Sequence, residues 1–212
     1  MDTKIINDVP NSTVVCILAH GAGAGIDTDF MNHVAEGLSQ KGIRVIRFEF
    51  PYMTKSRTLG KKRAPDTEKI LKAHFLSIIE EERVQTSHKN RKLFIGGKSM
   101  GGRIASILSS EKAHPDIAGC ICLGYPFHPP GKPEKLRTNH LQEFETPCLI
   151  IQGTRDPFGK KEEVCNYEID PRIEIAWIED GEHSLKTTKK SMQTWSEALD
   201  QAVTHIVDFV SS

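Results

Sequence analysis

Short apolar runs rich in valine and isoleucine recur along the chain, and segments with a helical period separate them. Within most runs, polar residues do not alternate with apolar ones, which is typical of strands covered on both faces of a parallel sheet. We expect six strands, at residues 13–19, 43–50, 92–96, 118–124, 148–153 and 172–178. Arg44, Arg47 and Glu49 interrupt the second run, so we expect it near a sheet edge or with its charges paired locally.

Apolar residues spaced three or four positions apart predict helices between these strands. One stripe is Phe30, Val34 and Leu38, a second is Leu71, Phe75, Ile78 and Ile79, and a third is Met192, Trp195, Leu199, Ala202, Ile206 and Val210. A further helical pattern covers residues 103–108, and Pro65 followed by residues 66–68 is a typical helix start. Strands that alternate with helices predict the α/β class, with a mostly parallel sheet of about six to seven strands and helices on both faces. No repeat, low-complexity tract or linker divides the chain, so we expect a single domain over residues 1–212.

Two segments show neither the helical nor the strand pattern of apolar residues, so we expect loops at residues 51–65 and 125–147. Each follows a strand, so each should emerge at the carboxyl edge of the sheet, where α/β sheets bind ligands. Neither loop is long enough to form a lid domain. The first loop carries five basic residues, Lys55, Arg57, Lys61, Lys62 and Arg63. This basic loop is either a solvated surface or a site that attracts an anionic substrate group or an acidic partner.

The charge of the chain is balanced, with 28 basic and 28 acidic residues among 212. This balance gives no electrostatic reason to bind nucleic acid or an anionic membrane. The first residues contain no apolar signal segment, and the apolar run 14–19 is too short to span a bilayer, so we expect a cytoplasmic protein. The five cysteines show neither CxxC nor zinc-ligand spacing, and we expect small buried thiols in a reducing compartment, with no metal site.

Residues 97–101 read Gly-Lys-Ser-Met-Gly, and they lie between an apolar run and a helical pattern. In this strand–turn–helix setting the pattern G-x-S-x-G is typical of a nucleophile elbow, in which a strained turn exposes the serine hydroxyl. Gly97 and Gly101 leave room where larger side chains would collide across the turn. The amides at the start of the following helix lie near the serine, where negative charge develops in acyl transfer. We therefore expect Ser99 to be a nucleophile.

A serine hydroxyl needs a base to take its proton and an acid to orient that base. In α/β hydrolases the chain order is serine, then an acid, then histidine. Asp156 follows the strand that ends at Gly153, and His183 follows the strand that ends near Ile178. Taken alone, Asp156 equally fits a turn, and His183 is one of nine histidines. Their order and their placement at strand ends favour a catalytic set of Ser99, Asp156 and His183.

A glycine-rich segment, residues 19–25, follows the first predicted strand. Small residues let the backbone approach a substrate oxygen, so we expect the amides of Ala22 and Met100 to form an oxyanion hole. A phosphate-binding loop is the alternative reading, but the G-x-G-x-x-G spacing and a GKS or GKT ending are both missing. We expect His20 to hold this segment by a hydrogen bond.

Three aromatic residues are expected to form walls of a substrate pocket from loop position alone, namely Phe30, Tyr52 and Phe127. Lys98 flanks the elbow. We expect its stem to pack and its ammonium to pair with a nearby carboxylate, and we do not assign it as a base.

Five segments carry a resemblance to a known family: residues 18–25, 47–53, 96–103, 123–128 and 152–159. On these segments, which span nearly the whole chain, the sequence resembles small α/β hydrolases related to dienelactone hydrolases. It is most similar to compact bacterial α/β-hydrolase-like proteins, whose animal relatives include a testis-expressed protein and a subunit of a chromatin acetyltransferase complex. The resemblance implies the α/β-hydrolase fold and the set of Ser99, Asp156 and His183.

The function that follows is a serine hydrolase that cleaves a carboxylic ester or thioester of a small acyl substrate through an acyl-enzyme, without a cofactor. The chain departs from dienelactone hydrolases at the nucleophile, which is typically cysteine there, so dienelactone is not the expected substrate. The alternative is a non-catalytic binding or scaffold protein that keeps the hydrolase fold, since some animal relatives act within complexes. The acyl chain, the leaving group and the oligomeric state stay open.

Overall fold

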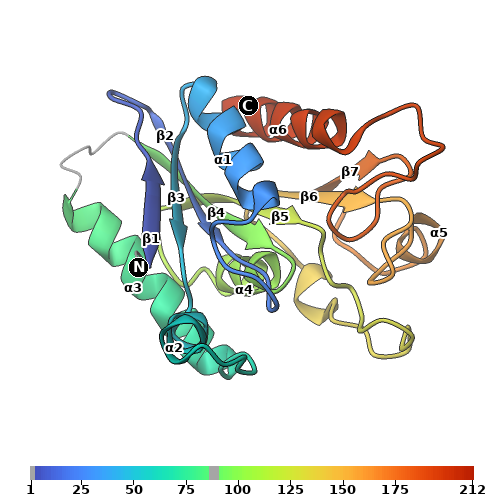
Figure 1. Ribbon diagram of the computed structural model, residues 1–212, viewed down its shortest axis with the longest axis horizontal. Helices are drawn as coiled ribbons and strands as arrows, with labels where there is room; N and C mark the ends of the chain where they lie inside the picture. The colour runs from blue at the N-terminus through green and yellow to red at the C-terminus, as the bar shows by residue number, and fades with distance from the viewer. Residues whose placement is uncertain (1–2, 86–90) are drawn as a thin grey trace.

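The computed structural model describes residues 3–85 and 91–212. Seven strands form one sheet in the order β1-β3-β2-β4-β5-β6-β7, and every neighbouring pair is parallel except β1 and β3 (Figure 1). The strands are β1 (Lys4–Asn7), β2 (Val14–Ala19), β3 (Arg44–Phe48), β4 (Lys92–Lys98), β5 (Ile117–Leu123), β6 (Cys148–Gly153) and β7 (Ile173–Ile178). The predicted α/β class and the mostly parallel sheet are confirmed.

All six predicted strands are present, and the structure adds β1 at one edge. β1 has only four residues and pairs with β3 alone, so its sequence is too short to show a strand pattern. β3 therefore lies one strand from the edge, where its charged residues find partners. The guanidinium of Arg44 pairs with Asp8 and, at 3.0 Å, with Glu82. Both expectations for this interrupted run, an edge position and local charge pairing, are confirmed.

Helices connect the strands. They are α1 (Asp29–Gln40), α2 (Pro51–Leu59), α3 (Glu68–Gln85), α4 (Met100–Ser110), α5 (Lys161–Val164) and α6 (Trp195–Ser211), with a 3-10 turn η1 (Asn139–Leu141) in the second predicted loop. The predicted stripes become α1, α3 and α6, and the pattern at 103–108 lies within α4. The third stripe begins later than expected, because Thr194 caps α6 by accepting a hydrogen bond from the amide of Glu197. Met192 lies before this cap with a fully exposed side chain, so its assignment to the stripe is wrong.

The prediction of a loop at residues 51–65 is wrong for most of these residues, because they form α2. Pro51 stands at the first helical position, where its fixed φ suits a helix, and Gly60 ends the helix with a left-handed φ of 60°. Within α2 only Tyr52 and Met53 are buried. The helix therefore has no apolar stripe that a search for periodicity could find.

Helices cover both faces of the sheet (Figure 1). α1 and α6 pack on one face, against side chains such as Leu18 and Ile121, and α3 and α4 pack on the opposite face, against Ile17 and Ile95. Because the adjacent residues Ile17 and Leu18 are both fully buried, one on each face, β2 reads as an uninterrupted apolar run. Among the described helices, none combines the length and the apolar character needed to cross a lipid bilayer.

Candidate active site

Ser99 occupies the sharp turn between β4 and α4. Its φ of 51° and ψ of −113° lie outside the regions that non-glycine residues favour, which stores strain on the order of 1–3 kcal/mol at this residue. A Cβ on Gly97 would lie 2.1 Å from the carbonyl oxygen of Ala19, and one on Gly101 would lie 2.5 Å from the same oxygen. Both glycines of the motif are therefore required for this turn to pack against the end of β2.

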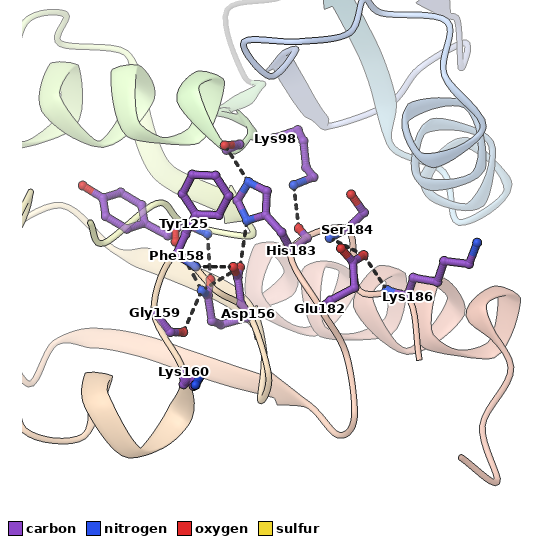
Figure 2. A network of polar contacts seen from close by, with 12 residues as sticks. Lys98, Tyr125, Asp156, Phe158, Gly159, Lys160, Glu182, His183, Ser184 and Lys186 are labelled. Carbon is purple, nitrogen blue, oxygen red and sulfur yellow. Dashed lines mark hydrogen bonds and ion pairs between the residues drawn. The ribbon is translucent and has the colours of Figure 1, made fainter. Parts of the chain in front are cut away.

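The hydroxyl of Ser99 contacts His183, which in turn contacts Asp156. Oγ of Ser99 lies 2.8 Å from Nε2 of His183. Nδ1 of His183 lies 2.8 Å from Oδ2 of Asp156 (Figure 2). Ser99 comes from the turn after β4, Asp156 from the turn after β6, and His183 from the loop after β7. The parallel strands thus bring three residues that are distant in the chain together at the carboxyl edge of the sheet.

The carboxylate of Asp156 is fully buried and surrounded by donors. Besides the contact with His183, Nε2 of Gln152 donates to Oδ2 at 2.9 Å, and the amide of Phe158 donates to Oδ1 at 2.8 Å. Because Asp156 accepts from each neighbour, Nδ1 of His183 carries the hydrogen of the imidazole. Nε2 of His183 is then free to accept the hydrogen of the Ser99 hydroxyl.

Gln152 is a supporting residue that the sequence analysis missed. It is fully buried near the end of β6. Its Nε2 also lies 3.2 Å from the carbonyl oxygens of Tyr125 and Gly159, and its Oε1 accepts from the amide of Tyr125 at 2.7 Å. Gln152 therefore fixes the turn that holds Asp156 to the start of the loop at 125–147. The signal available in the sequence was a single amide side chain at the end of an otherwise apolar run.

The imidazole of His183 is held from two further sides. Phe158 stacks on its ring with centroids 4.0 Å apart, and Nζ of Lys98 donates to its main-chain carbonyl at 2.6 Å (Figure 2). Burial lowers the pKa of His183 and the charge of Lys98 lowers it further, although the hydrogen bond to Asp156 opposes this. The imidazole is therefore neutral in the pH range where an exposed histidine begins to gain a proton.

Lys98 does not make the carboxylate pair expected from the sequence, because its ammonium bonds to a carbonyl. The ammonium also lies 5.5 Å from the centre of the Phe30 ring. Burial lowers the pKa of Lys98 to about 8, while the charges of Asp156 and Glu182 act in the opposite direction. Lys98 thus contributes both a positive charge and a tether to the immediate surroundings of His183.

His20 and Tyr52 fix the glycine-rich segment that follows β2. The amide of Phe50 donates to Nε2 of His20 at 3.1 Å, so Nδ1 carries the hydrogen and donates to the carbonyl of Gly21 at 2.6 Å. Burial lowers the pKa of His20 to about 4, which keeps the ring neutral. The hydroxyl of Tyr52 donates to the carbonyl of Ala22 at 3.0 Å. Because the peptide group is planar and trans, the amide of Ala22 points away from the Gly21 carbonyl that His20 holds.

A cavity of about 950 Å³ opens beside Ser99 and His183, and both Ala22 and Met100 line it. Within the described part of the chain, the amide of Ala22 has no hydrogen-bond acceptor. The amide of Met100 is the first of α4, a position that has no acceptor within the helix. Two residues whose amides are without an acceptor among the described residues therefore line the same cavity as Ser99.

Only one of the three expected wall residues lines this cavity, namely Phe30. Tyr52 and Phe127 are fully buried behind the wall, so their assignment to it is wrong. The hydroxyl of Tyr52 supports the glycine-rich segment from the rear. The ring of Phe127 packs against Tyr125 and Tyr167, with centroids 4.8 and 5.9 Å apart.

The basic residues of the first predicted loop do not line the cavity, although Arg57 lies directly behind Gly25, which does. Arg57 pairs with Asp27 at 2.5 Å and with Glu49 at 2.6 Å. Lys55, Lys61, Lys62 and Arg63 are either exposed on the surface of α2 or follow it as exposed residues. Within the described chain, none of residues 55–63 contributes to the cavity wall. The side chains of Lys55, Lys61, Lys62 and Arg63 accordingly form a solvated surface outside it.

One group of described side chains lies close enough together to share a metal ion, namely the thiols of Cys120, Cys122 and Cys148, whose sulfur atoms lie within 4.8 Å of one another. Hydrogen bonds that the Cys122 thiol makes to the neighbouring sulfur atoms, together with burial, raise its pKa. Burial acts to raise the pKa of Cys120, but hydrogen bonds from its neighbours lower it. All three are buried in the core, as expected, and so is Cys16. The expectation of a buried thiol is wrong for Cys165, which is exposed after α5.

A mostly parallel sheet, a serine at a strained strand–helix turn and a histidine and an aspartate at the same edge define the α/β-hydrolase class. A sequence comparison agrees with this assignment, because the family described as an alpha/beta hydrolase domain matches residues 12–211. The chain belongs to this family.

Solved structures share the fold at low sequence identity. A dienelactone hydrolase from Anabaena variabilis matches with a TM-score of 0.75 and 17% identity, over 98% of this chain and 90% of that chain. A homologue of α/β serine hydrolases from Coxiella burnetii matches with a TM-score of 0.71 and 16% identity, over 97% and 89%. A lid-less α/β serine hydrolase from Xanthomonas campestris matches with a TM-score of 0.66 and 17% identity, over 96% and 88%.

Proposed function

We propose that this protein is a serine hydrolase that cleaves a carboxylic ester or thioester through an acyl-enzyme. The observation that carries the proposal is the unbroken contact from Ser99 to His183 to Asp156, with 2.8 Å at each step. A nucleophile needs a base within hydrogen-bond reach, and that base needs a group to orient it. Other proteins with this fold are described as serine hydrolases or esterases, which supports the same reaction class.

In the proposed reaction, Oγ of Ser99 attacks the acyl carbon while Nε2 of His183 takes the hydroxyl proton. The bond to the leaving alcohol or thiol breaks, and His183 returns the proton to it, which leaves an acyl-Ser99 ester. Water then attacks this ester with His183 again as base, and the acid and the free Ser99 hydroxyl result. Asp156 keeps His183 in the required tautomer and stabilises its cation.

The oxyanion that forms at each addition step needs donors. We assign this role to the amides of Ala22 and Met100, which line the cavity beside Ser99. A donor of this kind contributes on the order of 3 kcal/mol to the stability of the transition state. The hydrogen bonds that His20 and Tyr52 make to the carbonyls of Gly21 and Ala22 support this assignment, because they fix the direction of the peptide groups in advance.

The direct test is labelling with a fluorophosphonate, which reacts with activated serines. We expect the parent protein to be labelled and Ser99→Ala not to be. Ser110→Ala is the matched control, since Ser110 lies at the end of the same helix with its hydroxyl on a main-chain carbonyl. Equal labelling of Ser99→Ala and the parent would show that the nucleophile is wrong.

A panel of short p-nitrophenyl esters and acyl thioesters then identifies the bond that is cleaved. Asp156→Asn should reduce kcat by about 10³–10⁴-fold, because the amide no longer enforces the tautomer with hydrogen on Nδ1. A variant that keeps parental kcat would contradict the role of Asp156.

A non-catalytic scaffold is the outcome that would follow if neither labelling nor turnover occurs. Kinship with the testis-expressed protein and the acetyltransferase-complex subunit stays a hypothesis. The single domain over residues 1–212, the cytoplasmic location and a small acyl substrate, with neither nucleic acid nor membrane as a partner, also stay predictions.

A further inference from the structure

Two arginines from different elements line the cavity, Arg103 on α4 and Arg137 in the loop at 125–147. Both belong to the wall of this one cavity, and burial and then the charge of Arg103 lower the pKa of the Arg137 guanidinium. Like charges in one wall repel each other, and the repulsion is relieved when an anion binds between them. This pair is therefore a candidate for substrate recognition.

Both guanidinium groups have N–H donors that make no hydrogen bond within the described chain. Nη2 of Arg103 bonds to Glu68 at 3.0 Å, but its Nε is buried and has no partner in the described chain. Within residues 3–85 and 91–212, the guanidinium of Arg137 makes neither a hydrogen bond nor an ion pair. The unmade hydrogen bond of the buried Arg103 Nε is costly. The half-buried guanidinium of Arg137 keeps its donors available to a ligand in the cavity.

Of the other charged residues in the cavity wall, three make contacts, and Asp29 is an exposed carboxylate without a partner in the described chain. Lys98 bonds to the carbonyl of His183, and the ammonium of Lys186 lies 5.8 Å from the centre of the Trp195 ring. The carboxylate of Glu182 accepts the amide of Ser184 at 2.8 Å. Arg137 is thus a cation in the cavity wall that has no partner within the described chain.

A buried polar network fixes the backbone at both arginines. The hydroxyl of Ser106 donates to the carbonyl of Arg103, and that of Tyr125 donates to the carbonyl of Arg137, each at 2.8 Å. Both hydroxyl hydrogens are then used, so Nε2 of His140 donates to these oxygens, at 2.8 Å to Ser106 and 3.3 Å to Tyr125. Burial lowers the pKa of His140 to about 4, so the ring adds no positive charge of its own. The network joins α4 to the loop and fixes the main chain from which the two cations project.

We propose that Arg137 and Arg103 form a subsite for a carboxylate or phosphate group carried by the substrate. A guanidinium fits the two oxygens of such a group, and the bond is charge-assisted. The amide of Arg103 bonds to the carbonyl of Ser99, so the subsite begins one helical turn, about 5.4 Å along α4, from the nucleophile. An anionic group a few bonds from the scissile carbonyl would reach it. This inference deepens the proposed hydrolase function and rests on it, because it assumes that the bound molecule is a substrate.

The first test measures binding alone. Glutarate and inorganic phosphate are titrated calorimetrically into the parent, into Arg137→Gln, and into Lys132→Gln, which removes an exposed charge from the same loop. We expect the parent and Lys132→Gln to bind at least one anion, and Arg137→Gln to bind it about tenfold more weakly or worse. The anion that binds identifies the source of the charge. If the parent binds neither, or Arg137→Gln binds like the parent, the subsite does not exist.

The second test measures turnover with matched esters. The kcat/KM for mono-p-nitrophenyl glutarate and for a phosphonate analogue is compared with that for neutral p-nitrophenyl valerate. In Arg137→Gln the ratio of anionic to neutral kcat/KM should fall about tenfold, and in Lys132→Gln it should not change. Equal ratios in all three proteins would overturn the subsite and leave the hydrolase intact. Absence of both turnover and Ser99 labelling would overturn the hydrolase, while the titrations still decide the subsite.

Discussion

The ammonium of Lys98 donates a hydrogen bond to the main-chain carbonyl of His183 at 2.6 Å. Lys98 ends β4 immediately before Ser99, and His183 lies in the loop after β7. The strand that presents Ser99 is therefore also tied to the loop that presents His183, its proposed base. The same ammonium acts on the imidazole through its charge, because burial and then the charge of Lys98 lower the pKa of His183.

Lys98→Met should move the acid limb of the pH–rate profile to higher pH. Without the positive charge, one of the causes that lower the pKa of His183 is gone, so the base becomes protonated at higher pH. The kcat/KM for a neutral p-nitrophenyl ester is measured from about pH 4.5 to pH 8. Lys92→Met at the exposed start of the same strand is the control and should leave the limb in place. A limb that stays or moves to lower pH in Lys98→Met contradicts this electrostatic role.

Ser99→Gly should be more stable than Ser99→Ala. Both lack the hydroxyl, but only glycine adopts a φ of 51° without a Cβ penalty. The strain released, on the order of 1–3 kcal/mol, exceeds the extra entropy of glycine in the unfolded chain, about 0.5–1 kcal/mol. We expect Tm to rise by about 2–4 °C relative to Ser99→Ala in thermal unfolding. An equal or lower Tm would mean that the elbow stores no strain.

Tyr52→Phe should lower kcat with little change in KM. The hydroxyl of Tyr52 holds the carbonyl of Ala22 but lies outside the cavity wall, so its loss loosens the proposed oxyanion donor without removing a substrate contact. We expect a loss of about tenfold in kcat, part of what the donor itself contributes. Tyr167→Phe serves as the control, because the hydroxyl of Tyr167 has no partner in the described chain. A rise in KM at constant kcat would instead return Tyr52 to the substrate pocket.

Stability should fall as the pH drops from about 6.5 towards 4. Burial lowers the pKa of both His20 and His140 from 6.5 to about 4, so in this window the unfolded chain takes up protons that the folded protein does not. Stability is therefore greatest above the unfolded pKa and declines by at most about 1.4 kcal/mol per pH unit for each histidine. Urea unfolding midpoints across this range measure the slope.

His140→Gln isolates one of the two histidines in the same experiment. It removes one titrating group, so the slope should become shallower than that of the parent. A parental slope in His140→Gln would show that His140 gains its proton in the folded protein as readily as in the unfolded chain.

The sequence was informative where the physics is local or repeats along the chain. Continuous apolar runs indicated the buried strands, and the order of Ser99, Asp156 and His183 at strand ends indicated one shared edge. It was uninformative where a short element depends on a partner, as for β1, which has four residues paired with β3. α2 was missed because its geometry comes from Pro51 and Gly60 and not from an apolar stripe.

The surroundings of the site could not be read from chain position. Tyr52 and Phe127 follow strands at the correct edge, but the direction of a side chain depends on tertiary packing, and both point into the core. Gln152 and Lys98 were not assigned their present partners for the same reason. Each acts through contacts with segments far away in the sequence, Gln152 on Asp156 and Tyr125, and Lys98 on His183.

A Cβ on either Gly97 or Gly101 would collide with the same atom, the carbonyl oxygen of Ala19. The glycine-rich segment continues from the next residue. The close approach of the serine turn to the end of β2 is therefore set by main-chain atoms, whereas the Ala22 amide further along is positioned by the side chains of His20 and Tyr52. A methyl group at either glycine would push the serine turn away from the end of β2, so this approach tolerates no side chain at positions 97 and 101.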